Sequence, residues 1–127
     1  MSKILVVDDD PMIRNLLVQI FEPFEEKGVE LLTADNGMDA IETVKKEHPE
    51  VVLLDVMMPK MNGFEACDIL KNELKLIDVY IIMLTAKGQE LDRQKAREIG
   101  ADFYITKPFD IDELTEKVSN IIDVRLT

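Results

Sequence analysis

Four aspartates follow two Val- and Leu-rich apolar runs of this sequence. Asp8, Asp9 and Asp10 come directly after the first run, and Asp55 comes directly after the second. If the two runs are neighbouring parallel strands, Asp55 and the pair Asp8 and Asp9 share one small volume at the carboxyl ends of the strands. Like charges this close are unfavourable unless a cation or a proton intervenes, and hard oxygen ligands suit Mg²⁺. We therefore expect a Mg²⁺ site built from these carboxylates.

A hydroxyl and an ammonium follow two further apolar runs. Thr85 comes after the run at 79–84, and Lys107 comes shortly after the run at 103–105. A hydroxyl donor, a fixed ammonium and a metal ion are what a phosphoryl group needs, because its transfer is catalysed mainly by positioning and charge neutralisation. A carboxylate beside them can act as a nucleophile and form an aspartyl phosphate. Asp55 is the candidate nucleophile, since it is the only carboxylate at its strand end.

Positioning these groups requires a particular arrangement of strands and helices. Continuous apolar runs without polar alternation indicate strands that are covered on both faces, and segments with helical spacing separate them. We therefore predict an α/β fold, a three-layer doubly wound parallel sheet of flavodoxin-like type with strand order 2-1-3-4-5. In that order the first and third strands are neighbours. The strands are expected at 4–7, 31–33, 51–54, 79–84 and 103–105, and the helices around 13–20, 40–44, 64–74, 91–99 and 114–122.

Local signals predict several element boundaries. Asp10 precedes Pro11, which is typical of a helix N-terminus, so we expect Asp10 to cap a helix rather than to bind metal. Pro23 should break or kink the first helix, and Gly100 falls where the fourth helix must end. Cys67 lies on an apolar helical stripe, which indicates a buried thiol.

Length and charge restrict the classes of function. The chain has 127 residues, with 15 Lys and Arg against 26 Asp and Glu, and its net charge is −11. We expect one domain, residues 1–127, that does not bind nucleic acid directly or attach to an anionic membrane, because both would repel it. The single Cys67 permits no internal disulfide, and the N-terminal segment lacks the features of a signal peptide. These observations favour a cytoplasmic protein.

Four segments resemble the signature blocks of the response regulator receiver domain of two-component signalling: ILVVDDDPMIR, VVLLDVMMPKMNG, IIMLTAKG and GADFYITKPF. The match covers the whole chain, and the order and spacing of the blocks are highly specific. The resemblance implies that Asp8 and Asp9 bind Mg²⁺ together with Asp55 and the backbone carbonyl of Met57. It also implies that Asp55 is the phosphoacceptor.

The same resemblance implies roles for residues of the last two strands. Thr85 would be the switch hydroxyl, and Lys107 would contact the phosphoryl group and form a cis peptide with Pro108. Tyr104 would be the aromatic side chain that changes rotamer on activation.

The resemblance further implies a phosphorylation-activated signalling switch. A sensor histidine kinase or a phosphotransfer protein would supply the phosphoryl group, and the domain would catalyse its own phosphorylation and dephosphorylation without being a turnover enzyme. A downstream effector or a second copy would bind the face formed by the fourth helix, the fifth strand and the fifth helix, expected at 91–99, 103–105 and 114–122.

Two other classes of function deserve comparison. Asp8 and Asp10 imitate the DxD motif of haloacid-dehalogenase-like Mg²⁺-dependent phosphatases, but Met12 replaces the usual Thr or Val. Asp110 and Asp112, after Lys107, should open a helix instead of ending a strand. A passive flavodoxin-like binding module would need amides around an anion after the first strand, where this chain has carboxylates.

Overall fold

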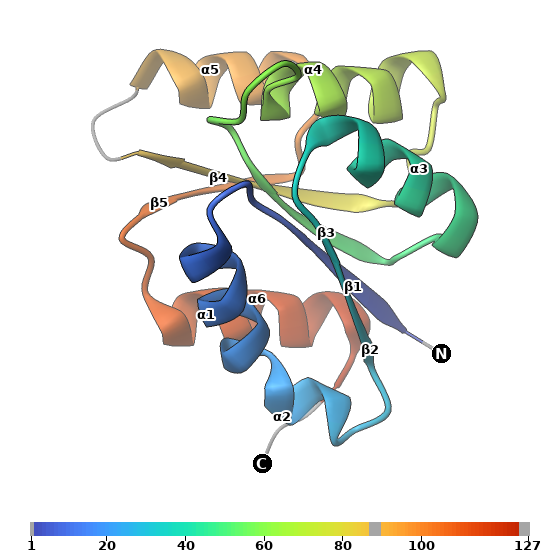
Figure 1. The fold of residues 1–127 in the computed structure, drawn as a ribbon, viewed down its shortest axis with the longest axis vertical. Helices are drawn as coiled ribbons and strands as arrows, with labels where there is room; N and C mark the ends of the chain where they lie inside the picture. The colour runs from blue at the N-terminus through green and yellow to red at the C-terminus, as the bar shows by residue number, and fades with distance from the viewer. Residues whose placement is uncertain (1, 87–89, 125–127) are drawn as a thin grey trace.

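The computed structural model describes residues 2–86 and 90–124, and these form one parallel sheet between two layers of helices (Figure 1). Each apolar strand leads into a helix that returns to the other end of the sheet. The strands are β1 (Lys3–Val7), β2 (Glu30–Ala34), β3 (Val51–Asp55), β4 (Tyr80–Ala86) and β5 (Phe103–Lys107). The helices are α1 (Pro11–Ile20), α2 (Glu22–Glu25), α3 (Gly37–Glu47), α4 (Gly63–Asp68), α5 (Glu90–Glu98) and α6 (Ile111–Ile122), with the π-helical turn η1 (Ile69–Glu73) after α4.

The strand order is β2-β1-β3-β4-β5, as predicted, and all four strand pairs are parallel. Val7 on β1 pairs with Leu54 on β3, so the next residues, Asp8 and Asp55, stand side by side at the carboxyl edge. Lys107 on β5 pairs with Ala86 on β4 at the same edge. The register therefore brings residues that are far apart in the sequence to one end of the sheet.

Two hydrophobic cores cover the two faces of the sheet. Alternate strand residues point to opposite faces, so Leu5 and Val7 join one core while Ile4 and Val6 join the other. Helices α3, α4 and α5 close the first core, and α1, α2 and α6 close the second, as Figure 1 shows. The four β1 residues Ile4, Leu5, Val6 and Val7 are fully buried. Burial on both faces explains why the strands read as continuous apolar runs.

The predicted helix ends are confirmed, with one correction. The Asp10 side chain accepts a hydrogen bond from the Met12 N–H as the N-cap of α1. The helix is interrupted between α1 and α2, next to Pro23. Gly100 follows α5 with a φ of +98°, a conformation that favours glycine. The correction concerns the segment 64–74, which was expected to be one continuous helix. It changes at Ile69 into the π-helical turn η1, where the Leu74 N–H donates to the Ile69 carbonyl.

Candidate functional site

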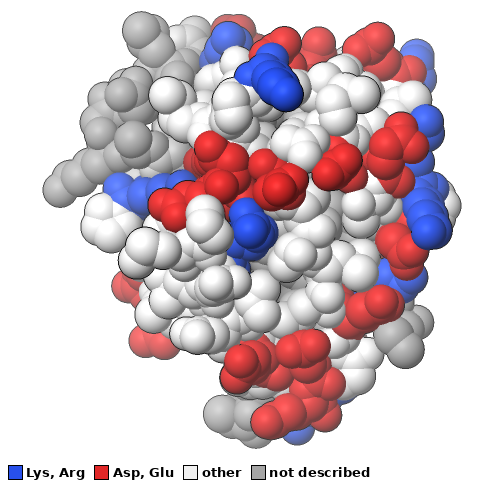
Figure 2. All heavy atoms as spheres, viewed as in Figure 1, with Lys and Arg blue, Asp and Glu red and all other residues white. Residues whose placement is uncertain are grey.

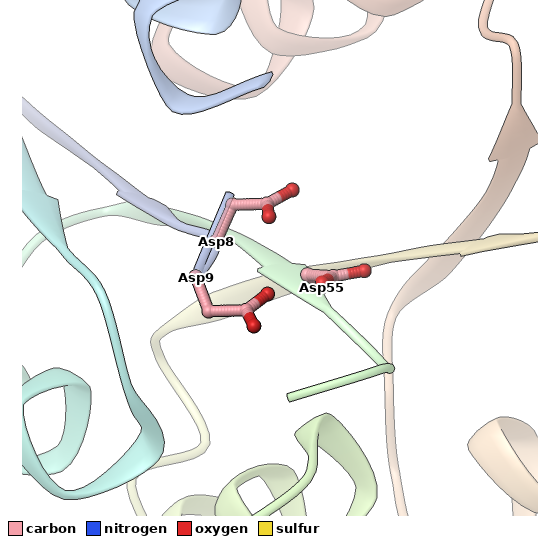
Figure 3. A group of neighbouring side chains, drawn as sticks. All are labelled: Asp8, Asp9 and Asp55. Carbon is pink, nitrogen blue, oxygen red and sulfur yellow. The ribbon is translucent and has the colours of Figure 1, made fainter. Parts of the chain in front are cut away.

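Three carboxylates converge at the carboxyl ends of β1 and β3. Asp8, Asp9 and Asp55 each offer an oxygen, and these oxygens all lie within 4.8 Å of one another. In Figure 3 the three side chains point to the same side from their strand ends. Asp8 is 1% exposed and Asp55 4% exposed, while Asp9 is exposed to solvent. An all-oxygen donor set with one side open to water fits Mg²⁺, which retains several of its waters.

Lys107 links two of these carboxylates. Its Nζ donates to Asp55 Oδ1 at 3.0 Å and to Asp8 Oδ2 at 3.1 Å. The Lys107 side chain is 26% exposed, whereas the side chains of Asp8 and Asp55 are 1% and 5% exposed. The ammonium therefore offsets the charge of two nearly buried carboxylates. The peptide bond from Lys107 to Pro108 is cis, as the sequence resemblance implies.

The same arrangement shifts two pKa values. Burial raises the pKa of Asp55, and the nearby Asp8 adds to this, whereas Lys107 and the backbone N–H of Met57 oppose it. Burial also works against the charge of Lys107, but the hydrogen bond and the charge of Asp55, together with Asp8, outweigh it and raise the pKa of Lys107. Asp55 is thus a nearly buried carboxyl group paired with the Lys107 ammonium.

Backbone contacts fix the loop between β1 and α1. The Asp10 N–H donates to Asp8 Oδ1 at 2.9 Å, so a loop amide orients the Asp8 side chain. The Arg14 guanidinium donates from Nη1 to the Asp8 backbone carbonyl at 2.8 Å. Arg14 was not among the site residues predicted from the sequence. Its position four residues after the N-cap Asp10 was the available signal in the sequence. A helical side chain lies over the turn that precedes it, which places Arg14 over the loop before α1.

A glycine allows the loop after β3 to pack against the backbone of Asp55. A Cβ on Gly63 would lie 2.4 Å from the Asp55 carbonyl oxygen, and the Gly63 N–H donates to the Val56 carbonyl at 2.9 Å. The start of α4 therefore lies against the Asp55 backbone. Met57 lies in this loop and is 71% exposed, and its backbone N–H works to lower the pKa of Asp55.

The two residues expected to act as a switch lie on β4 and β5. Thr85 is 1% exposed and pairs in register with Thr106, one residue before Lys107. Tyr104 is half-buried against the core under α3, α4 and α5, and the Arg93 guanidinium lies 5.0 Å from the centre of its ring. Thr85 therefore lies at the carboxyl edge with the acidic site, whereas Tyr104 lies further back along β5.

The arrangement does not match that of a DxD phosphatase. Asp10 is exposed and its carboxylate caps α1, so it is not part of the cluster that Asp8 and Asp9 form with Asp55. Asp110 likewise caps α6, where it accepts from the Glu113 N–H at 3.1 Å. Both aspartates have the helix-end positions that the sequence predicted for them.

The surface is strongly acidic on one face. Figure 2 shows Asp and Glu side chains gathered in a band across this face, with single Lys or Arg side chains beside it. This distribution agrees with the net charge of −11. Within residues 2–86 and 90–124, no helix has the length and apolar character needed to cross a membrane.

Comparison with known sequences supports one family. The response regulator receiver domain model matches residues 4–119. The "Probable transcriptional regulator ycf27" of Pyropia yezoensis is 45% identical over 121 residues, which is 95% of this chain and 47% of that protein. The alkaline phosphatase synthesis transcriptional regulatory protein PhoP of Bacillus subtilis is 40% identical over 121 residues, 95% of this chain and 48% of that protein. This chain thus spans about half the length of these relatives.

Two solved structures match this fold over nearly their whole length. The receiver domain of the Francisella response regulator 1452 superposes with a TM-score of 0.79 and 31% identity, covering 97% of this chain and 98% of that one. The chemotaxis protein CheY4 of Vibrio cholerae gives a TM-score of 0.81 and 29% identity, covering 95% and 98%. The family is regulatory and does not consist of turnover enzymes. This chain belongs to the response regulator receiver domain family of two-component signal transduction.

Proposed function

We propose that this domain is a phosphorylation-activated switch that accepts a phosphoryl group on Asp55 in a Mg²⁺-dependent reaction. The observation that carries the proposal is the position of Asp55. It lies within 4.8 Å of the oxygens of Asp8 and Asp9 on one side, and its Oδ1 lies 3.0 Å from Lys107 Nζ. A nucleophile beside an acidic cluster and a fixed ammonium is the arrangement that phosphoryl transfer requires.

The donor is a phosphohistidine of a sensor kinase or a phosphotransfer protein. A carboxylate oxygen of Asp55 attacks phosphorus, a P–O bond forms and the P–N bond of the donor breaks, after which the imidazole takes up a proton. Hydrolysis later reverses the modification. Water attacks the same phosphorus, the P–O bond to Asp55 breaks, and inorganic phosphate is released. The domain thus promotes its own phosphorylation and dephosphorylation, and Asp55 is restored after each cycle.

Each neighbouring residue has a distinct task. Asp8, Asp9 and Asp55 would hold Mg²⁺, with the Met57 carbonyl as a further ligand. The bound ion would neutralise charge that develops on the phosphoryl oxygens. Lys107 already contacts Asp55 and stays beside it to pair with a phosphoryl oxygen. Removing Lys107 or the ion should therefore slow the transfer.

The signal passes from Thr85 to the surface of β5. Phosphorylation adds roughly −1.5 to −2 charges and strong acceptor oxygens near the carboxyl edge. The Thr85 hydroxyl moves toward these oxygens, and Tyr104 turns inward into the space that becomes free. The surface that changes is formed by α5, β5 and α6, and it is the binding face for a downstream effector or a second copy. A cytoplasmic location agrees with the free, buried thiol of Cys67.

The proposal is tested by intact-mass analysis after incubation with acetyl phosphate. Wild type with Mg²⁺ should gain one phosphoryl group, and EDTA should abolish the gain. Asp55→Asn should remain unmodified under the same conditions, whereas Asp10→Asn, which keeps a capping oxygen, should be modified like wild type. Equal modification of wild type and Asp55→Asn would show that another residue is the acceptor.

A further inference from the structure

Arg14 makes a single short contact with the backbone of the acidic site. Its Nη1 donates to the Asp8 carbonyl at 2.8 Å, and the contact is partly buried. Arg14 is the only charged residue within α1. Its guanidinium has no contact with the carboxylate oxygens that face Asp55 in the hydrogen bonds of the described residues. It therefore acts on the backbone of Asp8 and not on its side chain.

The backbone N–H and the backbone carbonyl of Asp8 are held by different elements. The Asp8 N–H donates to the Ala34 carbonyl at the end of β2, at 3.2 Å. The Asp8 carbonyl belongs to the peptide that continues into Asp9, and this carbonyl accepts from Arg14. The orientation of that peptide sets the direction in which the Asp9 side chain leaves the loop. Asp9 is exposed, so little side-chain packing fixes it otherwise.

We infer that Arg14 is a positioning residue for the metal site. By holding the Asp8 carbonyl, its guanidinium orients the Asp8–Asp9 peptide so that the Asp9 carboxylate faces those of Asp8 and Asp55 before any ion binds. The inference rests on the proposed function, since it requires that these carboxylates hold Mg²⁺. Removing a group that orients a metal ligand typically weakens metal binding by 10- to 100-fold.

Charge alone predicts the opposite result. A guanidinium near a cation site repels the ion, so its removal should strengthen Mg²⁺ binding if Arg14 acts only through its charge. Arg14 also lines a hollow of about 390 Å³ together with Asp35, Asp39 and Glu42, whose charges partly offset its own. The sign of the change in Mg²⁺ affinity therefore separates positioning from electrostatics.

The test is Mg²⁺ affinity measured by titration calorimetry on wild type, Arg14→Met and Arg14→Lys. Arg14→Met keeps an unbranched stem but loses the donor, and it should bind Mg²⁺ about tenfold more weakly than wild type. Arg14→Lys keeps the charge, but its Nζ ends one bond short of the position of Nη1, so it should also bind more weakly. Lys45→Met removes an exposed cation on α3 and serves as the charge control, with affinity close to that of wild type.

The possible outcomes separate this inference from the proposed function. If wild type binds Mg²⁺ and Arg14→Met binds it equally or more tightly, the positioning role is wrong and the proposed function stands. If wild type shows no binding, both are overturned. Melting in EDTA identifies a variant that fails to fold. If Arg14→Met does not fold, Arg14→Lys decides, because its charge is unchanged: weaker binding supports the role, and wild-type affinity contradicts it.

Discussion

Lys107 Nζ lies 3.0 Å from Asp55 Oδ1, although β5 and β3 are separated in the sheet by β4. The long side chain of Lys107 therefore reaches past the end of the intervening strand. It also contacts Asp8 Oδ2 at 3.1 Å, so one ammonium connects the ends of three strands. This contact joins the last strand, whose surface is expected to bind partners, to the residue expected to receive the phosphoryl group.

Replacing Lys107 should destabilise the metal-free protein. Lys107→Met leaves Asp55 and Asp8 buried without their cation, which should cost about 3 kcal/mol of unfolding free energy at neutral pH. The pKa of Asp55, already raised by burial, should rise further when Lys107 no longer opposes the shift. A raised carboxyl pKa means that the folded state binds the proton more tightly, so the deficit should shrink as the pH falls.

Urea unfolding in EDTA, at neutral and mildly acidic pH, measures this effect. Lys60→Met, which removes an exposed cation from the loop after β3, is the control and should behave like wild type at both pH values. A deficit for Lys107→Met that is independent of pH would indicate lost packing and not an unpaired carboxylate.

Asp9 should matter for the metal and not for the fold. Asp9→Ala removes one of three crowded carboxylates, so without metal it should unfold at no lower temperature than wild type. At a Mg²⁺ concentration of 100 times its dissociation constant, wild type should gain about 2.7 kcal/mol, and the variant should gain almost none. Differential scanning calorimetry with Mg²⁺ or EDTA provides both values. Full stabilisation of Asp9→Ala by Mg²⁺ would remove Asp9 from the ligand set.

Thr85 should be needed for transmission and not for phosphorylation. Thr85→Ala should still accept a phosphoryl group on Asp55, because the carboxylates and Lys107 are unchanged. Backbone amide shifts on adding beryllofluoride, a mimic of the phosphoryl group, should be strongly reduced for this variant across α5 and around Tyr104. Thr85→Ser keeps the hydroxyl and should restore them. Wild-type shift changes in Thr85→Ala would contradict the coupling.

Cys67 should make stability depend on pH in the alkaline range. Burial raises the pKa of this thiol from 9.0 to about 12. Above about pH 9 the unfolded chain loses the thiol proton while the folded chain keeps it, so the unfolding free energy should fall with pH, by at most about 1.4 kcal/mol per unit. Cys67→Ala should lack this contribution. Parallel pH dependences for wild type and variant would show that the thiol ionises equally in both states.

Much of the fold could be predicted from the sequence because burial on both faces leaves a direct signal. The run before Asp8 and the run before Asp55 contain no polar alternation, and in the structure both lie between the two cores. Parallel strands have their carboxyl ends at one edge, so the residues after these runs had to meet there. Asp10 was separated from them by its own local signal, the following Pro11, and it caps α1.

Other features depend on contacts that no local pattern specifies. The turn η1 contains Lys71, whose side chain is 7% exposed. Its Nζ pairs at 2.8 Å with Asp102, the residue before β5. By sequence alone Lys71 is an ordinary polar helix residue, so neither its burial nor the π-helical turn could be predicted. The spacing of Arg14 after Asp10 places its side chain near this loop, but its partner is a backbone carbonyl, which is present at every residue, so the contact itself could not be predicted.

The identity of the phosphoacceptor can be measured directly by chemical trapping. Borohydride reduces an aspartyl phosphate to homoserine, which peptide mass spectrometry then locates in the sequence. After incubation of wild type with acetyl phosphate and Mg²⁺, we predict homoserine at position 55 and none when EDTA replaces Mg²⁺. Homoserine at position 8, the nucleophile position of a DxD phosphatase, or unmodified Asp55 in protein that has gained a phosphoryl group, would contradict the assignment of Asp55.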